Sequence, residues 1–279
     1  MKKYDRIARG KDRLTISLPL DLLTSLDNAI DGKEIRNRSH AIEHFLRKSL
    51  KPSVTNAVIL AGSPVQTKTP PCLTTIDGRN LLDITLEHIA AARFRNVYML
   101  AGSSTGTLKA SVGRHSHGLT VHWIPETEPM GTGGALKLLE GTITEPFLVL
   151  HGDILTNIPI QPFIDFHMYE QTMVTIAVKP RHSEPKYGQV TLQGNRITTF
   201  TRHDRGTGIS VINTGVYMVN PALFSYLPKG KPSTVEADVF PRLAVENQLS
   251  AFFFQGMWFD INSHTNMRDV VRRYHLERR

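Results

Sequence analysis

Two aspartates follow apolar runs, at positions where carboxylates commonly bind a metal ion. Asp153 ends the stretch Phe147-Leu-Val-Leu-His-Gly-Asp, and Asp260 follows Trp258 and Phe259. In open α/β sheets, ligands bind beyond the carboxyl ends of the strands, and acids there can hold a cation between phosphate groups. Considered alone, each aspartate could equally be an exposed loop residue or a helix cap. As a pair, Asp153 and Asp260 could form a Mg²⁺ site.

A glycine-rich turn precedes the first of these aspartates. Pro129-Met-Gly-Thr-Gly-Gly-Ala135 leads into a helical pattern near residues 135–139. Glycines let a backbone approach a planar or phosphorylated ligand closely, and the start of a helix supplies free N–H groups. A plain tight turn explains the same residues equally well, so the turn is a candidate site only in combination with the two acids.

The elements that must position these residues alternate between strand and helix. The sequence predicts strands over 56–61, 96–101, 119–124 and 146–151, and helices over 79–92 and 163–170. Further strands are predicted over 172–178, 189–192, 196–200, 209–218 and 251–254. Short helices are predicted near 221 and over 235–247, and a last helix from 264. This order predicts an α/β domain carrying a subdomain that covers its ligand crevice.

The overall composition narrows the class of protein. The 279 residues are 40% hydrophobic and 21% charged, an ordinary globular balance. No run of about 18 apolar residues and no secretory signal pattern is found, so we expect a cytoplasmic protein that does not enter a membrane. The single cysteine, Cys72, excludes an internal disulfide framework and is expected to be a semi-buried thiol. His117, His122 and His151 have no acid or cysteine at ligand spacing, which argues against a histidine metal cluster.

The first 51 residues hold most of the net charge of +8, with 12 Lys/Arg against 7 Asp/Glu. Residues 13–18 alternate strictly between polar and apolar, which predicts a strand ended by Pro19. Amphipathic helices are predicted over 20–30 and from Ser39, as N-cap, to residue 50. One strand and two helices cannot bury a core alone, so the strand is expected to pair with a second copy about a two-fold axis.

This segment resembles the ribbon-helix-helix family of DNA-binding proteins. The resemblance rests on Arg13-Leu-Thr-Ile-Ser-Leu-Pro19 and on Asn37-Arg-Ser39 opening the second helix. It implies a homodimer, or a higher oligomer, whose antiparallel ribbon enters the major groove of double-stranded DNA. Arginine can read guanine there, and Thr or Ser can read either kind of base edge. The alternative is a module that only pairs subunits. The implied DNA-binding residues are Arg13, Thr15, Ser17, Arg38 and Ser39.

From about residue 56 to 270 the chain resembles the sugar-1-phosphate nucleotidyltransferase family. The glycine turn, His151-Gly-Asp, Asn213-Thr-Gly-Val-Tyr217, residues 235–241 and residues 256–261 carry the resemblance in the expected order. It implies an NTP and a sugar 1-phosphate across the crevice, with Mg²⁺ held by Asp153 and Asp260 once a nucleotide is bound. The implied nucleotide-binding residues are Ala61, Gly62, Met130, Gly131, Thr132, Gly133 and Gly134. The implied sugar-binding residues are Tyr187, Gly188, Arg202, Asn213, Gly215 and Glu236.

The loop over residues 62–73 departs from that family. Gly62 is kept, but the arginine that the family places after it is missing, and Pro71 stands where its catalytic lysine is expected. Pro64 also removes a backbone N–H that a phosphate cradle would use. Lys68 is the only nearby substitute, at a spacing that fits neither role well. Loss of one transition-state donor typically costs about 10²–10³ in rate, so this loop indicates impaired catalysis.

We therefore expect two domains. Residues 1–52 form the ribbon-helix-helix domain, and residues 53–279 form a Rossmann-like α/β fold with a mixed, mostly parallel sheet and helices on both faces. The favoured interpretation is a DNA-binding transcriptional regulator whose second domain, a pseudoenzyme, senses a nucleotide sugar, NTP or sugar phosphate. The alternative is an active sugar-1-phosphate nucleotidyltransferase with a dimerising or autoregulatory N-terminal module. A third possibility is a purely structural dimer. The loop distinguishes the first two, since a sensor need not neutralise a leaving pyrophosphate.

Overall fold

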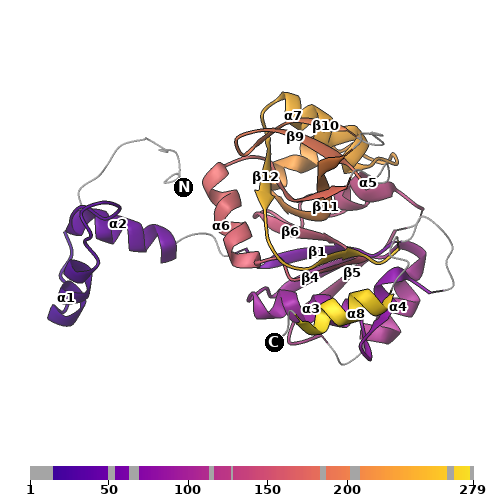
Figure 1. Cartoon of the computed structure of the whole chain (residues 1–279), viewed down its shortest axis with the longest axis horizontal. Coiled ribbons are helices and arrows are strands. Elements are labelled where there is room, and N and C mark those ends of the chain that lie inside the picture. Colours follow the sequence, from indigo (N-terminus) through magenta and orange to yellow (C-terminus); the bar gives the residue numbers. More distant parts are fainter. Residues whose placement is uncertain are drawn as a thin grey trace, which may run out of the picture. The chain divides into compact units, whose positions relative to one another are not determined.

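The computed structural model describes residues 15–49, 54–62, 69–112, 116–126, 128–182, 187–201, 208–262 and 267–276 (Figure 1). The chain divides into two compact units, Met1–Ser53 and Val54–Arg279. Each unit has its own hydrophobic core.

The first unit contains two helices, α1 (Leu20–Asn28) and α2 (Arg38–Ser49). Its buried apolar side chains are Leu26, Ile35 and Ala41. The predicted N-cap of the second helix was wrong by two residues. The side-chain oxygen of Asn37 accepts the backbone N–H of His40, at 2.9 Å, so Asn37 caps α2 and Ser39 lies inside its first turn. Both residue types are good caps, and only the local geometry distinguishes them.

The strand predicted over residues 13–18 is not found in the part of it that the structure describes. Residues 15–19 have no regular secondary structure, and residues 13 and 14 lie outside the described residues. A strand needs a neighbour to accept and donate its backbone hydrogen bonds. An alternating pattern in one chain therefore does not by itself produce a strand.

The second unit is built on a nine-stranded sheet with the order β5-β4-β1-β6-β11-β8-β12-β10-β9. The strands β5, β4, β1 and β6 are parallel to one another. Beyond β6 the pairings are antiparallel except for β12 with β8, so the sheet is mixed and its mostly parallel character is confined to the first half. The strands are β1 (Asn56–Leu60), β4 (Asn96–Leu100), β5 (Thr120–Ile124), β6 (Phe147–His151), β8 (Val174–His182), β9 (Gln189–Gln193), β10 (Arg196–Thr201), β11 (Ile209–Val219) and β12 (Leu249–Phe253).

Helices cover both faces of this sheet, as predicted (Figure 1). On one face, α3 (Leu81–Ala91), α4 (Thr105–Val112) and α6 (Ile160–Glu170) bury apolar side chains in one cluster. On the other, α5 (Gly131–Lys137), η3 (Pro221–Tyr226), η4 (Val235–Val239) and α7 (Phe240–Val245) form a second cluster. Central strands such as β1 and β6 are buried on both faces, which explains their continuous apolar runs.

Several short elements were not predicted. They are η1 (Pro71–Leu73), β2 (Thr75–Ile76), β3 (Arg79–Asn80), η2 (Gly102–Ser104), β7 (Ile154–Thr156) and β13 (Trp258–Asp260), together with helix α4. The last helix, α8 (Met267–Leu276), closes a third cluster with β2, β7 and β13. Elements of two or three residues carry no usable periodicity, so only tertiary contacts reveal them.

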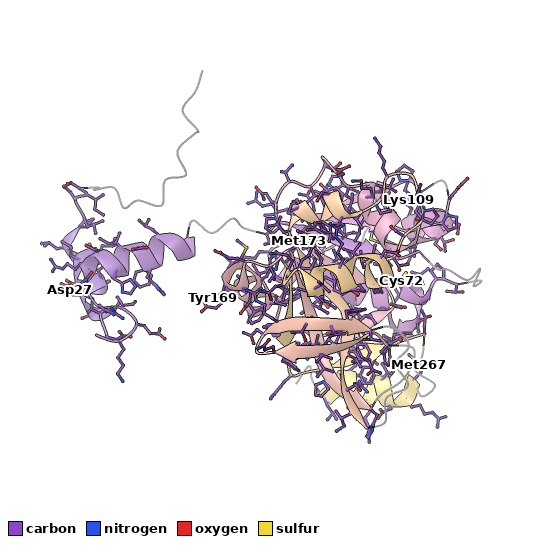
Figure 2. The ribbon with its side chains drawn as sticks, turned by 90° about the horizontal axis from the view of Figure 1, so that it is seen from above. Asp27, Cys72, Lys109, Tyr169, Met173 and Met267 are labelled. Atoms are coloured by element: carbon purple, nitrogen blue, oxygen red, sulfur yellow. The ribbon has the colours of Figure 1, made fainter. Side chains whose placement is uncertain are left out.

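Cys72 (Figure 2) is more buried than predicted, with 1% of its surface exposed, and burial raises the pKa of its thiol to about 12.

Candidate active site

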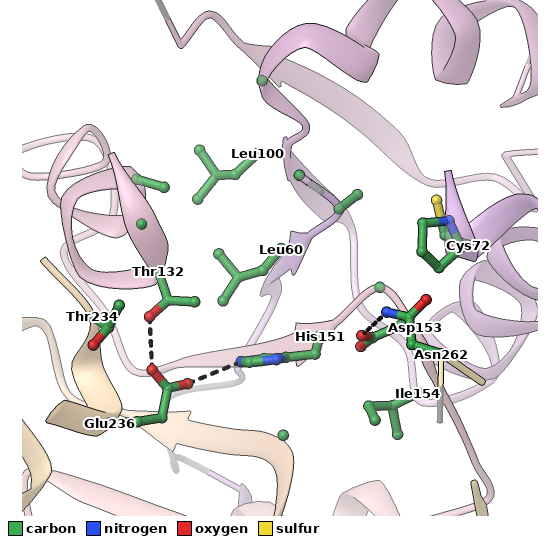
Figure 3. Close-up of a pocket in the computed structure, with 18 of the residues that line it drawn as sticks. Leu60, Cys72, Leu100, Thr132, His151, Asp153, Ile154, Thr234, Glu236 and Asn262 are labelled. Carbon is green, nitrogen blue, oxygen red and sulfur yellow. Dashed lines mark hydrogen bonds and ion pairs between the residues drawn. The ribbon is translucent and has the colours of Figure 1, made fainter. Parts of the chain in front are cut away.

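A cleft of about 670 Å³ opens at the carboxyl ends of β1, β4 and β6, the edge where ligands of α/β sheets bind (Figure 3). It draws its walls from segments that are far apart in the sequence. Among the residues predicted to bind a ligand, the cleft brings together Ala61, Gly62, Gly131, Thr132, Asp153, Tyr187, Gly188, Asn213, Gly215, Glu236 and Asp260. Met130, Gly133 and Gly134 do not line it. Lys68 and Arg202 lie outside the described residues.

The two predicted metal acids meet at one end of this cleft because two short strands pair there. In the antiparallel pair of β13 and β7, Asp260 lies opposite Ile154, the residue after Asp153. The backbone N–H of Ile261 donates to the Asp153 carbonyl at 2.9 Å. The amide of Asn262 donates to the Asp153 carboxylate at 2.7 Å, which fixes the orientation of that carboxylate (Figure 3).

The electrostatics of these acids fit a divalent cation. Burial raises the pKa of Asp153 and the charge of Asp260 adds to the increase, although His151 attracts the carboxylate. Two carboxylates close together in a buried place repel each other unless a cation or a proton intervenes. Carboxylate oxygens are also the donors that Mg²⁺ prefers in proteins. The residues therefore fit a magnesium ion held by Asp153 and Asp260.

In the cleft, the Glu236 carboxylate contacts side chains from three separate segments of the chain. Its Oε2 accepts the Thr132 hydroxyl at 2.9 Å, and Thr132 in turn accepts the Val235 N–H at 3.0 Å. Its Oε1 lies 3.3 Å from His151 Nε2 and accepts the Tyr217 hydroxyl at 3.2 Å. Figure 3 shows the His151 ring between Glu236 and Asp153. A one-turn π-helix, η4, carries Glu236 to this position, and such turns are frequent at functional sites.

Burial and pairing shift the titration of this pair in opposite directions. Burial lowers the pKa of His151, but the hydrogen bond and charge of Glu236 outweigh burial and raise it overall. Burial raises the pKa of Glu236, but His151 and Thr132 hold it well below its usual range. The pair is therefore a largely buried ion pair with its hydrogen-bond partners in place, the condition under which a buried charge is tolerated.

The family model for nucleotidyl transferases matches residues 63–276, which is most of the chain. The chain belongs to the nucleotidyl transferase family. Among curated proteins, a probable mannose-1-phosphate guanylyltransferase 1 of Oryza sativa subsp. japonica is 31% identical over 163 residues, 56% of this chain and 45% of that protein. A mannose-1-phosphate guanyltransferase of Emericella nidulans is 27% identical over 219 residues, 74% of this chain and 60% of that protein. The chain thus spans about half to three-fifths of the length of these relatives.

Solved structures show that the fold is shared. The crystal structure of HddC from Yersinia pseudotuberculosis complexed with GMP-PN has a TM-score of 0.68 at 21% identity, covering 79% of this chain and all of that chain. UDP-glucose pyrophosphorylase complexed with UDP-glucose has a TM-score of 0.66 at 16% identity, covering 80% of this chain and 99% of that chain. Identities this low establish the nucleotidyl transferase fold alone.

The glycine turn of this chain differs from the prediction. The backbone N–H groups of Gly133 and Gly134 both donate to the Ser233 carbonyl, at 2.9 and 3.3 Å, so they are not free for a ligand. A Cβ on Gly131 would lie 2.5 Å from that carbonyl oxygen. The glycines therefore allow the turn to pack against the Ser233 backbone, and Gly131 is the one glycine of the turn that lines the cleft.

Asn213 and Gly215, which were predicted to bind the sugar, have structural partners. The Asn213 side chain donates to the Tyr217 hydroxyl at 2.9 Å and accepts the Gly215 N–H at 2.9 Å. Gly215 has φ +76°, and a Cβ there would lie 3.2 Å from the His151 ring. These two residues therefore shape the place that His151 occupies, in addition to lining the cleft.

Positive charge is scarce in the described wall of the cleft. Among the lining residues that the structure describes there is no lysine or arginine, whereas five are acids: Glu126, Glu128, Asp153, Glu236 and Asp260. Pro71 and the buried Cys72 line the cleft where the family's lysine is expected.

Within the described residues, no group of three or more His, Cys, Asp or Glu side chains is placed to hold a metal ion.

Sequence reasoning missed several polar groups of the cleft. His151 was considered as a metal ligand and as part of a family motif but not as a partner of Glu236, and Glu126, Thr234 and Asn262 were not considered. His151 is the last residue of β6, at the carboxyl end of a parallel strand, and this position was a usable signal because ligands bind at that edge of such sheets. The hydrogen-bond partners of Glu126 and Asn262 lie in loops, and no sequence periodicity predicts them.

In the described part of the chain, no helix is both long and apolar enough to cross a membrane.

Proposed function

We propose that the second unit binds a nucleoside triphosphate and a sugar 1-phosphate in this cleft and joins them. A phosphate oxygen of the sugar 1-phosphate forms a bond to the α-phosphorus of the nucleotide, and the bond to pyrophosphate breaks. The observation that supports this most is the pairing of Asp153 and Asp260 at one end of a nucleotidyl transferase cleft.

The chain's own residues contribute chiefly position. Asp153 and Asp260 would hold Mg²⁺, which when bound neutralises phosphate charge. Gly131 and Thr132 line the nucleotide side, and Tyr187 and Asn213 line the sugar side. The hydrogen bond between Thr132 and Glu236 fixes the distance between these two sides. Positioning of this kind accounts for much of catalysis in phosphoryl and nucleotidyl transfer.

Guanosine triphosphate and mannose 1-phosphate are the first substrates to test, because both curated relatives described above carry the name mannose-1-phosphate guanyl(yl)transferase. The experiment incubates the full chain with Mg²⁺, each of the common NTPs and a panel of sugar 1-phosphates, and measures pyrophosphate and nucleotide sugar together. We expect pyrophosphate and nucleotide sugar in equal amounts for one combination of NTP and sugar 1-phosphate. Absence of product with every pair, at protein concentrations that bind nucleotide, would overturn the proposal of activity.

A second candidate function is binding without turnover, as in a sensor. The observation that favours it is the described cleft wall, which has Pro71 at the lysine position and no lysine or arginine. A sensor would bind a nucleotide sugar, NTP or sugar phosphate and release no pyrophosphate. Thermal unfolding with each ligand separates the cases, because saturation at 100 times the Kd adds about 2.7 kcal/mol of stability. A shift without product supports the sensor.

For the first unit we propose a homodimer that binds double-stranded DNA. Its small core leaves several large apolar side chains exposed, as expected for a unit completed by a second copy. They are Ile16, Leu20, Leu22, Phe45 and Leu46. Arg38 holds α2 to α1 through a double hydrogen bond to Asp27 at 2.6 Å, so Arg38 has a structural role beside any contact with DNA. Thr15, Ser17 and Ser39 remain proposed DNA contacts, with Arg13, which lies outside the described residues.

Sedimentation of the full chain and selection from a random DNA library test this second proposal. We expect a dimer and an enriched sequence motif. Arg13→Ala should weaken binding to the selected sequence by about 1–3 kcal/mol relative to a scrambled one. A monomer with no enriched motif would overturn the proposal and leave the proposal for the cleft untouched.

A further inference from the structure

One edge of the nine-stranded sheet has no neighbouring strand in the described part of the chain. This edge belongs to β5 (Figure 1), which pairs with β4 on one side only. At the other end of the sheet, β9 pairs with β10 and also with β11, so both of its edges are at least partly occupied. A free strand edge offers unpaired N–H and C=O groups to another strand.

The backbone of β5 shows which groups lie on the free edge. The N–H of Thr120 donates at 2.8 Å to the carbonyl of Arg95, the residue before β4. Because successive residues of a strand direct their backbone groups to opposite sides, His122 also directs its groups toward β4. The N–H and C=O groups of Val121 and Trp123 therefore point away from β4, onto the free edge.

β5 lacks the features that commonly keep a strand edge from pairing. Such edges are often protected by charged side chains, by proline or by a bulge. The five residues of β5, Thr-Val-His-Trp-Ile, include no Lys, Arg, Asp, Glu or Pro, and their register with β4 runs without a shift. The His122 ring is stacked on the Tyr98 ring at 4.7 Å, on a face of the sheet. Nothing in the strand itself therefore blocks pairing.

This edge is complementary to a second copy of itself. In an antiparallel pair, two residues whose backbone groups point at each other exchange two hydrogen bonds. A two-fold axis at His122 places Val121 opposite Trp123 of the partner subunit, and the same axis generates the equivalent second pair. Every outward backbone group of Val121 and Trp123 then has a partner. A strand with this self-complementary register fits a second copy of this chain better than an unrelated segment.

We propose that two copies of the second unit pair their β5 strands antiparallel about a two-fold axis, so that one sheet continues through both copies. The carboxyl ends of β1, β4 and β6 then point in opposite directions in the two copies, and the two clefts open away from each other. The pairing does not depend on the function proposed for the cleft. A homodimer of the first unit would favour it, because a tethered second copy has an effective concentration of about millimolar.

Disulfide formation between two copies of the full chain tests the register. His122 faces its own counterpart in a non-hydrogen-bonded pair, whose Cα atoms lie about 4.5 Å apart, within reach of a disulfide. The Thr120 residues of the two copies lie about 14 Å apart along the strands. The native thiol of Cys72 is buried and does not compete. Under mild oxidation, His122→Cys should give at least about tenfold more linked dimer than Thr120→Cys, since a disulfide needs Cα atoms within about 7 Å.

Proline substitution tests the backbone hydrogen bonds. Val121→Pro removes an N–H on the free edge and no bond to β4, and proline is tolerated at such edge positions. In the His122→Cys background, Val121→Pro should lower the yield of linked dimer severalfold. Val121→Ala is the matched control, because it keeps the N–H, and it should leave the yield unchanged. Thermal unfolding of each variant shows that it is folded.

Equal linking of His122→Cys and Thr120→Cys, or none in either, would overturn the proposal. That result is expected if a segment of another protein occupies this edge. Equal yields from folded Val121→Pro and Val121→Ala would overturn it as well. If Val121→Pro does not fold, the comparison of the two cysteine variants is sufficient. None of these results changes the test of the proposed function, which measures products of the cleft.

Discussion

The Thr132 hydroxyl donates a hydrogen bond of 2.9 Å to Glu236, a residue 104 positions further along the chain. Thr132 lies in the first turn of α5, on the side proposed to bind the nucleotide, and Glu236 belongs to the π-helix η4. Because Glu236 also contacts His151 and Tyr217, one carboxylate connects three segments around the ligand space. The shape of the cleft therefore depends on this bond.

Thr132→Val should widen or loosen the cleft without changing the size of the side chain. It leaves the mostly buried carboxylate of Glu236 without one of its donors, and a hydrogen bond to a charged group contributes about 1.5–3 kcal/mol. We expect nucleotide affinity to fall by about tenfold or more, measured by calorimetry. Thr120→Val, at an exposed position of β5, is the control and should leave the affinity unchanged. Equal affinities in the two variants would show that the bond is dispensable.

Gly131→Ala should destabilise the second unit more than Gly141→Ala. Both glycines have positive φ, +69° and +79°, so both substitutions cost about 1–2 kcal/mol for the left-handed backbone. Only at Gly131 would the new Cβ also lie 2.5 Å from the Ser233 carbonyl oxygen, whereas nothing lies within 4 Å at Gly141. Urea unfolding monitored by Trp fluorescence should show the larger loss for Gly131→Ala. Equal losses would contradict the close packing of the turn.

Acid should destabilise the second unit through His167. His167 is 3% exposed, its Nδ1 lies 2.7 Å from the Thr175 hydroxyl, and burial lowers its pKa to about 4. The unfolded chain, with a histidine pKa of about 6.5, binds more protons between these values, so stability falls as the pH drops from about 6.5 to 4. The loss should approach roughly 3 kcal/mol.

The measurement for His167 is urea unfolding at pH 7 and pH 5, for the unmodified chain and for His167→Gln. The variant removes the titrating group but keeps a polar side chain near Thr175. It should lose less stability between the two pH values than the unmodified chain. A variant with the same pH dependence as the unmodified chain would exclude His167 as the source.

Strands that form long apolar runs could be predicted from sequence. The strands β1, β4, β6 and β11 lie within a residue or two of their predicted positions, because their apolar runs are buried on both faces. The placement of Asp153 and Asp260 in one cleft also followed from their positions after apolar runs. The pairing of β7 with β13, which brings these acids together, involves strands of three residues and was not predictable.

The roles of single residues in the turn were harder to predict. A glycine that approaches a ligand and a glycine that approaches another part of the backbone look the same in a sequence, and Gly133 and Gly134 are of the second kind. Asn37 and Ser39 are both good caps, and local geometry selected Asn37. In each case the deciding partner comes from a tertiary contact or a backbone angle that residue types do not encode.

The reverse reaction tests the central claim most directly. The full chain is incubated with GDP-mannose, pyrophosphate and Mg²⁺, and the formation of GTP is followed by chromatography, alongside Asp153→Asn and Asp260→Asn. The account predicts GTP formation by the unmodified chain and a decrease of about 10²–10³-fold in each variant, because each removes a charge that would hold the metal. GTP formation at the same rate in all three proteins, or none from the unmodified chain although GDP-mannose binds to it, would contradict the account.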